Sequence, residues 1–140
     1  MDALIWAKMH GATTHFPIAL VLCSGACDAA GWLRGERAPA RELHAVGFWT
    51  ILLGALGTVP AVISGIVMTK GEVLGHGTLR WHHLFAWPAF AFIVAAATWR
   101  VVSGPGVSRR KMTGYLIAMV ATTTLVCIAG YWGGELLLLS

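Results

Sequence analysis

Long, mainly apolar stretches alternate with short polar segments along the whole chain. About 20 apolar residues suffice for a helix to cross the hydrocarbon core of a bilayer. We predict membrane-spanning helices at about 15–33, 44–68, 81–102 and 113–139. The connections 34–43, 69–80 and 103–112 are rich in glycine, proline and charge, as helix ends are. The pattern predicts an all-α integral membrane protein, a single four-helix up-down bundle over residues 1–140, with a separate short interfacial helix at 1–9.

The overall composition supports a membrane protein. Of the 140 residues, 57% are hydrophobic and 11% are charged, whereas a soluble domain carries about 25% charged residues. The mean hydropathy is +0.72. No small-residue cleavage site follows the first apolar stretch, so we expect no signal peptide. All three cysteines fall inside apolar stretches and no Cys-x-x-Cys-His motif is present, so any haem would be bound non-covalently.

The basic residues are divided unequally between the two membrane faces. We name the face before the first span side A and the opposite face side B. The basic residues near side A are Lys8, Lys70 and Arg80. Those near side B are Arg34, Arg37, Arg41, Arg100, Arg109, Arg110 and Lys111. Short basic loops stay in the cytoplasm, so we expect a multi-pass membrane protein with side B in the cytoplasm and both termini on the non-cytoplasmic side. The formal net charge of +4 therefore reports topology and not nucleic-acid binding.

Stripes of small residues predict which helix faces meet, because lipid itself is as apolar as leucine. The predicted inward stripes are Ala19, Cys23, Ala26 and Ala30; Gly47, Thr50, Gly54, Gly57, Ala61 and Gly65; Ala86, Ala89, Ile93 and Ala96; and Gly130 with Gly134. Pro60 and Pro88 interrupt the second and third spans and predict kinks. His15 and His82 lie one turn before the first and third stripes, so both are expected to point into the bundle near side A.

Five of the six histidines lie on or near side A. Two inward imidazoles on facing helices of a bundle can be the axial ligands of a b-type haem. We therefore predict that His15 and His82 bind the haem iron, and that Lys8 and Arg80 pair with the propionates. The further cofactor-binding candidates are His10 and His83. The sequence leaves open whether the third helix turns its first or its second histidine inward.

The histidines near side A also admit interpretations without haem. His15, His82 and Glu135 together would suit a divalent metal, since two histidines and a carboxylate bind zinc or iron. The same end of the bundle would equally suit a quinone, with a histidine hydrogen-bonded to its carbonyl. The remaining histidines near side A would, in the simplest interpretation, only reach for interfacial water.

Two polar residues near side B, Asp28 and His44, are also expected to lie at or inside the bundle. Asp28 is expected to be an interfacial acid paired with Arg34 or Arg100. His44 lies one turn before Gly47 and is expected to face inward. No second histidine accompanies it near side B, so a second haem is not expected there.

Both ends of the chain carry distinctive motifs. Residues 10–20 read H-G-A-T-T-H-F-P-I-A-L and residues 130–136 read G-Y-W-G-G-E-L. They resemble the H-x4-H-F-P-I opening and the G-W-x-G-G-x-L closing segment of an uncharacterised bacterial four-helix inner-membrane family of unknown function. His82 matches a histidine that opens the third helix of that family, whereas Gly11 replaces a frequent proline. The resemblance implies His10, His15 and His82 as family-like positions, and favours electron transfer because members often occur beside cytochromes.

The sequence therefore predicts a membrane electron-transfer subunit that resembles a b-type cytochrome. It would hold one haem near the outer face and link a quinone pool to a partner redox protein within a hetero-oligomeric complex. It would be at most a non-catalytic subunit of an oxidoreductase, since no nucleophile–base set or phosphate-binding loop is present. The alternatives are a cofactor-free anchoring subunit and a His/Glu metal-binding protein. If His15 and His82 face lipid, the haem hypothesis fails.

Overall fold

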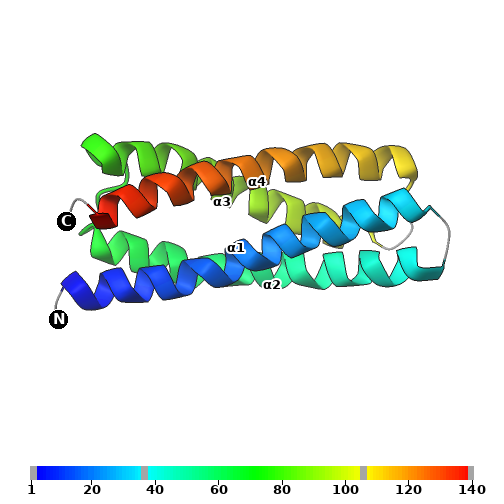
Figure 1. The fold of residues 1–140 in the computed structure, drawn as a ribbon, viewed down its shortest axis with the longest axis horizontal. Coiled ribbons are helices and arrows are strands. Elements are labelled where there is room, and N and C mark those ends of the chain that lie inside the picture. The colour runs from blue at the N-terminus through cyan, green and yellow to red at the C-terminus, as the bar shows by residue number, and fades with distance from the viewer. Residues whose placement is uncertain (1–2, 36–37, 105–106, 139–140) are drawn as a thin grey trace.

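The computed structural model describes residues 3–35, 38–104 and 107–138, except the side chains of 3, 4, 137 and 138. Its helices are α1 (Ala3–Arg34), α2 (Ala38–Met68), α3 (Gly77–Ser103) and α4 (Arg109–Leu138). Each is long and apolar enough to cross a membrane. The four helices lie side by side in alternating directions, and the two ends of the chain lie at the same end of the bundle (Figure 1). The predicted all-α, four-helix membrane architecture is confirmed.

The first helix differs from the prediction at its start. We expected a separate interfacial helix at 1–9, but α1 begins at Ala3 and continues to Arg34 through Pro17. Residues 1 and 2 lie outside the described part of the chain. The prolines of α2 and α3, Pro60 and Pro88, also lie inside uninterrupted helices. In lipid a broken helix would leave its backbone groups without water to bind, so the helix persists where a soluble one would end.

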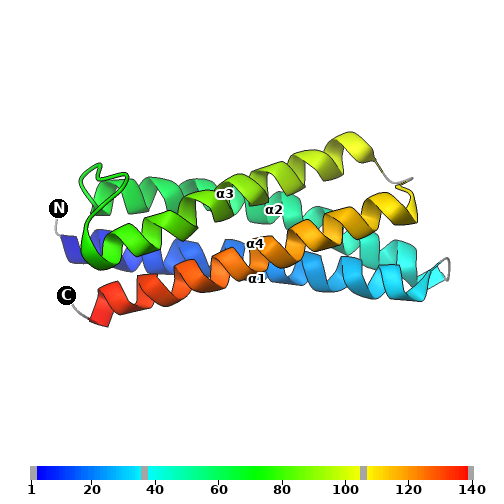
Figure 2. The ribbon, with the colours of Figure 1, turned by 90° about the horizontal axis from the view of Figure 1, so that it is seen from above.

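The bundle consists of two helical hairpins. α1 packs closely along α2, and α3 along α4, whereas the contacts between the two hairpins are fewer (Figure 2). Gly104, with φ of +65°, ends α3 in a conformation that suits glycine, and its N–H donates to the carbonyl of Arg100. Val21, Ile51 and Met119 are almost fully buried at the centre. This apolar layer separates the side A end of the bundle from the side B end.

The predicted inner faces are right for α2 and α3. Gly47, Gly54 and Ala61 are buried on α2, and Ala89 and Ile93 are buried on α3. Both stripes were marked by small residues in a regular helical repeat, and both meet neighbouring helices closely.

The predicted inner face is wrong for α1, where Ala19, Cys23 and Ala26 are exposed. On α4 the predicted pair, Gly130 and Gly134, is not packed against another helix but borders the cavity near side A. The residues buried on α1 are instead Pro17, Val21, Ser24, Asp28 and Gly31. Those buried on α4 are Met112, Tyr115, Met119, Thr122, Val126 and Ala129. Small side chains pack equally well against lipid, whereas a serine or an aspartate requires the interior.

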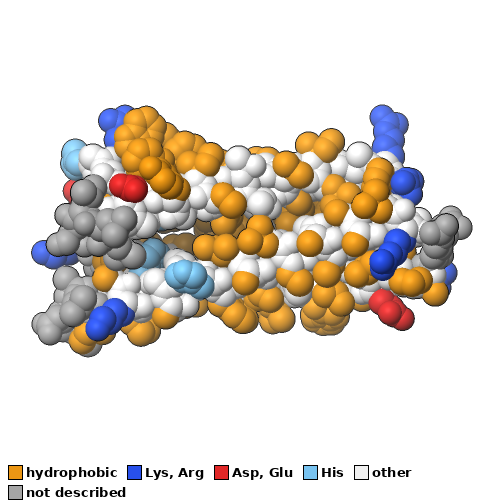
Figure 3. Space-filling view, in the orientation of Figure 1, with side chains coloured by type: hydrophobic (Ala, Val, Ile, Leu, Met, Phe, Trp, Pro, Cys, Tyr) orange, Lys and Arg blue, Asp and Glu red, His pale blue; other side chains and the backbone are white. Residues whose placement is uncertain are grey.

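The surface has the polarity of a membrane-embedded protein. Charged side chains gather at the two ends, and a broad apolar band lies between them (Figure 3). Large side chains such as Leu56 and Ile117 are each 68% exposed within this band. Trp81 and Trp132 stack at the side A end, with ring centroids 5.9 Å apart, as aromatic residues do at a membrane interface. The bilayer is therefore the main partner of this surface.

Candidate functional site

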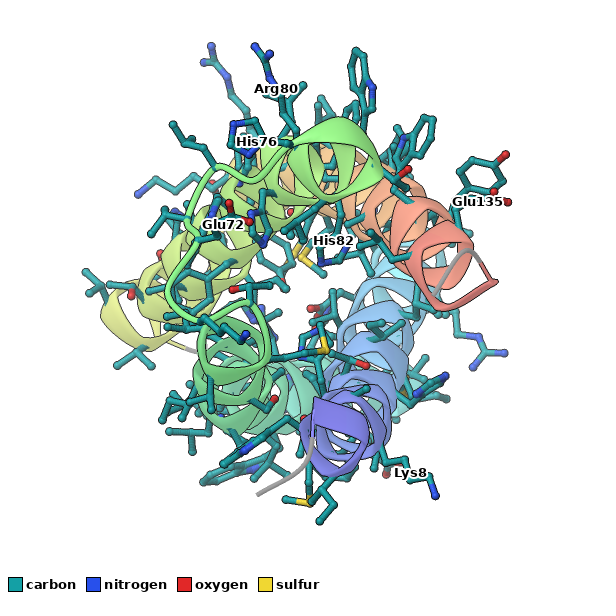
Figure 4. All side chains as sticks on the ribbon, turned by 90° about the vertical axis from the view of Figure 1, so that its left-hand side faces the viewer. Lys8, Glu72, His76, Arg80, His82 and Glu135 are labelled. Carbon is teal, nitrogen blue, oxygen red and sulfur yellow. The ribbon has the colours of Figure 1, made fainter. Side chains whose placement is uncertain are left out.

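A cavity of about 370 Å³ lies between the four helices near side A. Its volume falls in the range of about 300–1,000 Å³ that is typical of small-molecule sites. The lining is mainly apolar and comes from all four helices. Seen from the side A end, the bundle has an opening at its centre, and His82 points into it (Figure 4). The space-filling view shows a hollow at this end with histidine side chains beside it (Figure 3).

Two histidines from different hairpins meet at this cavity. His10 on α1 and His82 on α3 have ring centroids 6.3 Å apart and ring planes at 86°. His10 belongs to the buried stripe of α1, two turns before Pro17. His82 lies on the inner face of α3, two turns before Ala89. The pair therefore spans the gap between the two hairpins.

Each of these two rings is held by a backbone carbonyl of its own hairpin. Nδ1 of His10 donates to the carbonyl of Ala61, 3.0 Å away, and Nδ1 of His82 donates to that of Ala129, 2.8 Å away. A carbonyl only accepts, so the proton of the neutral ring resides on Nδ1 and Nε2 keeps its lone pair. Nε2 of neither ring has a hydrogen-bond partner among the described residues. Metal-binding histidines show this arrangement, in which an outer acceptor fixes the tautomer.

Two glycines make room for the imidazoles. A Cβ atom built at Gly65 would lie 3.0 Å from Cε1 of His10, and one at Gly133 would lie 3.2 Å from Nδ1 of His82. Each glycine follows the carbonyl acceptor of its own hairpin by four residues, so both hairpins seat their histidine in the same way. The sequence interpretation missed the second glycine, although an Ala-x-x-x-Gly spacing occurs in both α2 and α4.

The structure does not bring His15 and His82 together. His15 is exposed at the margin of the cavity, and its Nδ1 hydrogen-bonds to the carbonyl of Gly11 on its own helix. The predicted inward orientation of His15 is therefore wrong, and His10 takes that place. The two residues are five apart on α1, which turns their side chains about 140° away from each other.

The other histidines near side A lie close to this pair or away from it. His83 is buried beside the cavity, its ring centroid 5.7 Å from that of His82 and 6.3 Å from that of Trp87. Of the two adjacent histidines of α3, the first therefore faces the partner ring. The side chain of His76 is almost fully exposed and lies 3.4 Å from the carboxylate of Glu72.

The expected charged partners of a cofactor point away from the cavity. Lys8, Arg80 and Glu135 all project outward from the bundle (Figure 4). Lys8 and Arg80 do not line the cavity, and their pairing with propionates stays a prediction. Among the described residues no group of three His, Cys, Asp or Glu side chains could hold a metal ion, so the proposed triad of two histidines and Glu135 is not formed.

A second polar cluster lies near side B, inside the bundle. Asp28 is fully buried, and its Oδ1 accepts from Nδ1 of His44 at 2.8 Å and from Nη2 of Arg100 at 3.1 Å. The expected pairing with Arg100 is confirmed, whereas Arg34 is exposed. The predicted interfacial position of Asp28 is wrong, because the carboxylate is fully buried inside the bundle, where the cation of Arg100 compensates it. A Cβ atom at Gly47 would lie 2.6 Å from the carboxylate, so glycine there seats the aspartate. His44 faces inward as predicted, but its partner was missed.

Comparison with known proteins identifies a family but no function. A family model described as a predicted membrane protein (DUF2231) matches residues 7–138. Neither the curated proteins nor the solved structures give a match.

Proposed function

The chain belongs to the DUF2231 family of predicted membrane proteins, and we propose that it binds one b-type haem near side A. His10 and His82 would hold its iron. The observation that carries the proposal is the pair of opposed imidazoles, each fixed through Nδ1 and each with Nε2 free. His10 replaces His15 in the ligand pair that the sequence suggested.

The spacing and the surroundings fit such a group. The ring centroids of His10 and His82 lie 6.3 Å apart across the gap between the hairpins, so the two imidazoles would hold the group between them, and the lining of the adjacent cavity is mainly apolar. Next to the pair, a Cβ atom at Gly11, Gly130 or Gly134 would meet nothing within 4 Å. This open space beside the imidazoles, with its apolar lining, suits the edge of a planar macrocycle.

The chemistry would be one-electron transfer, which haem supplies when bound. The residues of this chain hold the iron through two neutral imidazoles, exclude water with an apolar lining, and so influence the reduction potential. We propose that the protein serves as an electron-transfer subunit between a quinone pool and a partner redox protein. The helices expose a wide apolar surface to lipid and to partner subunits, and only short connections reach water.

The proposed location is a bacterial inner membrane with side B in the cytoplasm. Exposed basic residues support this orientation, since short basic loops remain cytoplasmic. Those exposed near side B are Arg34, Arg41, Arg109, Arg110 and Lys111, against Lys8, Lys70 and Arg80 near side A. Arg100 is buried in the bundle and does not count as a loop charge, and Arg37 lies outside the described residues.

The test is a reduced-minus-oxidised absorbance spectrum of the purified protein. We expect the α-band of protohaem in the wild type and its loss in His10→Ala and in His82→Ala. His15→Ala and His76→Ala are the matched controls, since both histidines are exposed near the same end, and both variants should keep the band.

Two results would change the conclusion. A band lost in His15→Ala but kept in His10→Ala would overturn the ligand assignment and leave the haem in place. No band in folded wild-type protein, prepared with its native partners, would overturn the haem itself and favour a cofactor-free anchoring subunit.

A further inference from the structure

Ser64 of α2 lies directly behind His10. It is only 3% exposed, and its Oγ lies 3.0 Å from the carbonyl of Ala61 and 3.2 Å from Nδ1 of His10. The hydroxyl has one proton, which it donates to the carbonyl, so its oxygen accepts from the imidazole. The hydroxyl of Thr13 lies 3.3 Å from the same oxygen and donates its own proton to the carbonyl of Met9. The Nδ1–H group of His10 is therefore shared between two oxygens, the carbonyl and the hydroxyl.

The other hairpin has no such hydroxyl. The residue before Gly133 corresponds to Ser64 before Gly65, and it is Trp132. Its indole stacks on Trp81 at the membrane interface. Nδ1 of His82 has the Ala129 carbonyl as its one hydrogen-bond partner among the described residues. The two imidazoles thus differ in the hydrogen-bond partners of Nδ1, although each has a carbonyl acceptor followed four residues later by a glycine that makes room for the ring.

From this asymmetry we infer that Ser64 is a positioning residue that adds a second acceptor to the Nδ1–H group of His10, strengthens the tautomer that the Ala61 carbonyl selects, and makes the two haem ligands unequal. The inference rests on the proposed haem site. An acceptor at Nδ1–H raises the basicity of the ligating Nε2. A more basic ligand favours ferric over ferrous iron, so Ser64 lowers the reduction potential.

Potentiometric titration of the haem in Ser64→Ala tests this role. We expect the ferric preference to fall about threefold, which raises the midpoint by roughly 28 mV for one electron. Thr122→Val is the control, because Thr122 is a fully buried hydroxyl that bonds only to Ala118 of its own helix. Ser64→Thr, which restores a hydroxyl, should return the midpoint toward the wild-type value.

A second measurement does not depend on haem. In protein labelled with ¹⁵N-histidine, the His10 resonances, assigned by their loss in His10→Ala, should report the Nδ1–H tautomer. Ser64→Ala should increase the fraction with the proton on Nε2. An unchanged tautomer ratio, or equal midpoints in Ser64→Ala and the wild type, would overturn the role of Ser64. Wild-type protein without haem but with the expected tautomer shift would overturn the haem proposal alone.

Discussion

The two ends of the bundle are held together in different ways. Near side B, polar contacts join all four helices, since Asp28, His44, Arg100 and Tyr115 come from α1, α2, α3 and α4. Near side A, the interhelical hydrogen bonds of the described side chains stay within one hairpin each, as those of His10 and His82 do. The cavity lies at the end that lacks cross-links.

The difference shows how one small bundle can hold its helices in a defined arrangement at side B and keep a cavity between them at side A. Buried charges in a membrane must find partners, so the cluster around Asp28 determines how the helices are rotated and aligned. The described part of the side A end has no such buried ion pair, and space remains between the hairpins there. Substitutions at the two ends should therefore affect different properties, stability at side B and ligand binding at side A.

Arg100→Ala should have the largest effect on stability. It removes a cation from a fully buried carboxylate, and breaking such a pair costs about 3–5 kcal/mol. The measurement is thermal or denaturant unfolding in detergent. Arg110→Ala, at an exposed position near the same face, should change stability by less than about 0.5 kcal/mol. Equal stabilities for the two variants would contradict a structural role for the buried cluster.

Gly47→Ala should destabilise the protein by a smaller amount. The added Cβ atom would lie 2.6 Å from the Asp28 carboxylate, and overpacking of this kind costs about 1–3 kcal/mol. Gly114→Ala is the control, because nothing lies within 4 Å of its Cβ position. The same unfolding measurement applies, and an unchanged Tm in Gly47→Ala would show that the carboxylate moves freely.

Gly65→Ala and Gly133→Ala should affect ligand binding more than stability. Each new methyl group would lie against a histidine that borders open space, so the ring can shift and the loss of stability should stay at or below the low end of the about 1–3 kcal/mol that overpacking costs. The displaced ligand should lower the haem content per protein, measured by absorbance. Gly114→Ala, at an unobstructed Cβ position near side B and away from the cavity, should retain full content; a parallel loss there would indicate a general effect on the helix.

Single cysteines at exposed positions should change neither stability nor ligand binding, and they report which face of the membrane each end of the bundle occupies. In a variant whose three native cysteines are replaced by alanine, Ser108→Cys should react with a membrane-impermeant thiol reagent only from the cytoplasmic side. Lys70→Cys should react only from the opposite side. Both positions are exposed, near side B and side A respectively. Reversed labelling would show that the basic loops do not set the orientation.

The histidines show how far sequence reasoning reaches. It placed five of the six near side A and chose His82 correctly as an inward residue of α3. It failed on α1 because the stripe from Ala19 to Ala30 is two residues out of register with the buried one, roughly 200° around the helix. That error exchanged His15 for His10. The polar signal that could have corrected it was Ser24 with Asp28, which lie on the buried face.

The sequence by itself determined that four helices cross the membrane and where they begin and end to within several residues, except at the start of α1, which lies at Ala3 and not near residue 15. Length and hydropathy suffice for that, because the bilayer demands about 20 apolar residues per span. Only the tertiary structure decided which way each helix faces. Small residues suit lipid and protein alike, so the rotation of α1 and α4 depends on partners supplied by distant segments. Asp28 needs Arg100, His10 needs the carbonyl of Ala61, and these pairings exist only in the assembled bundle.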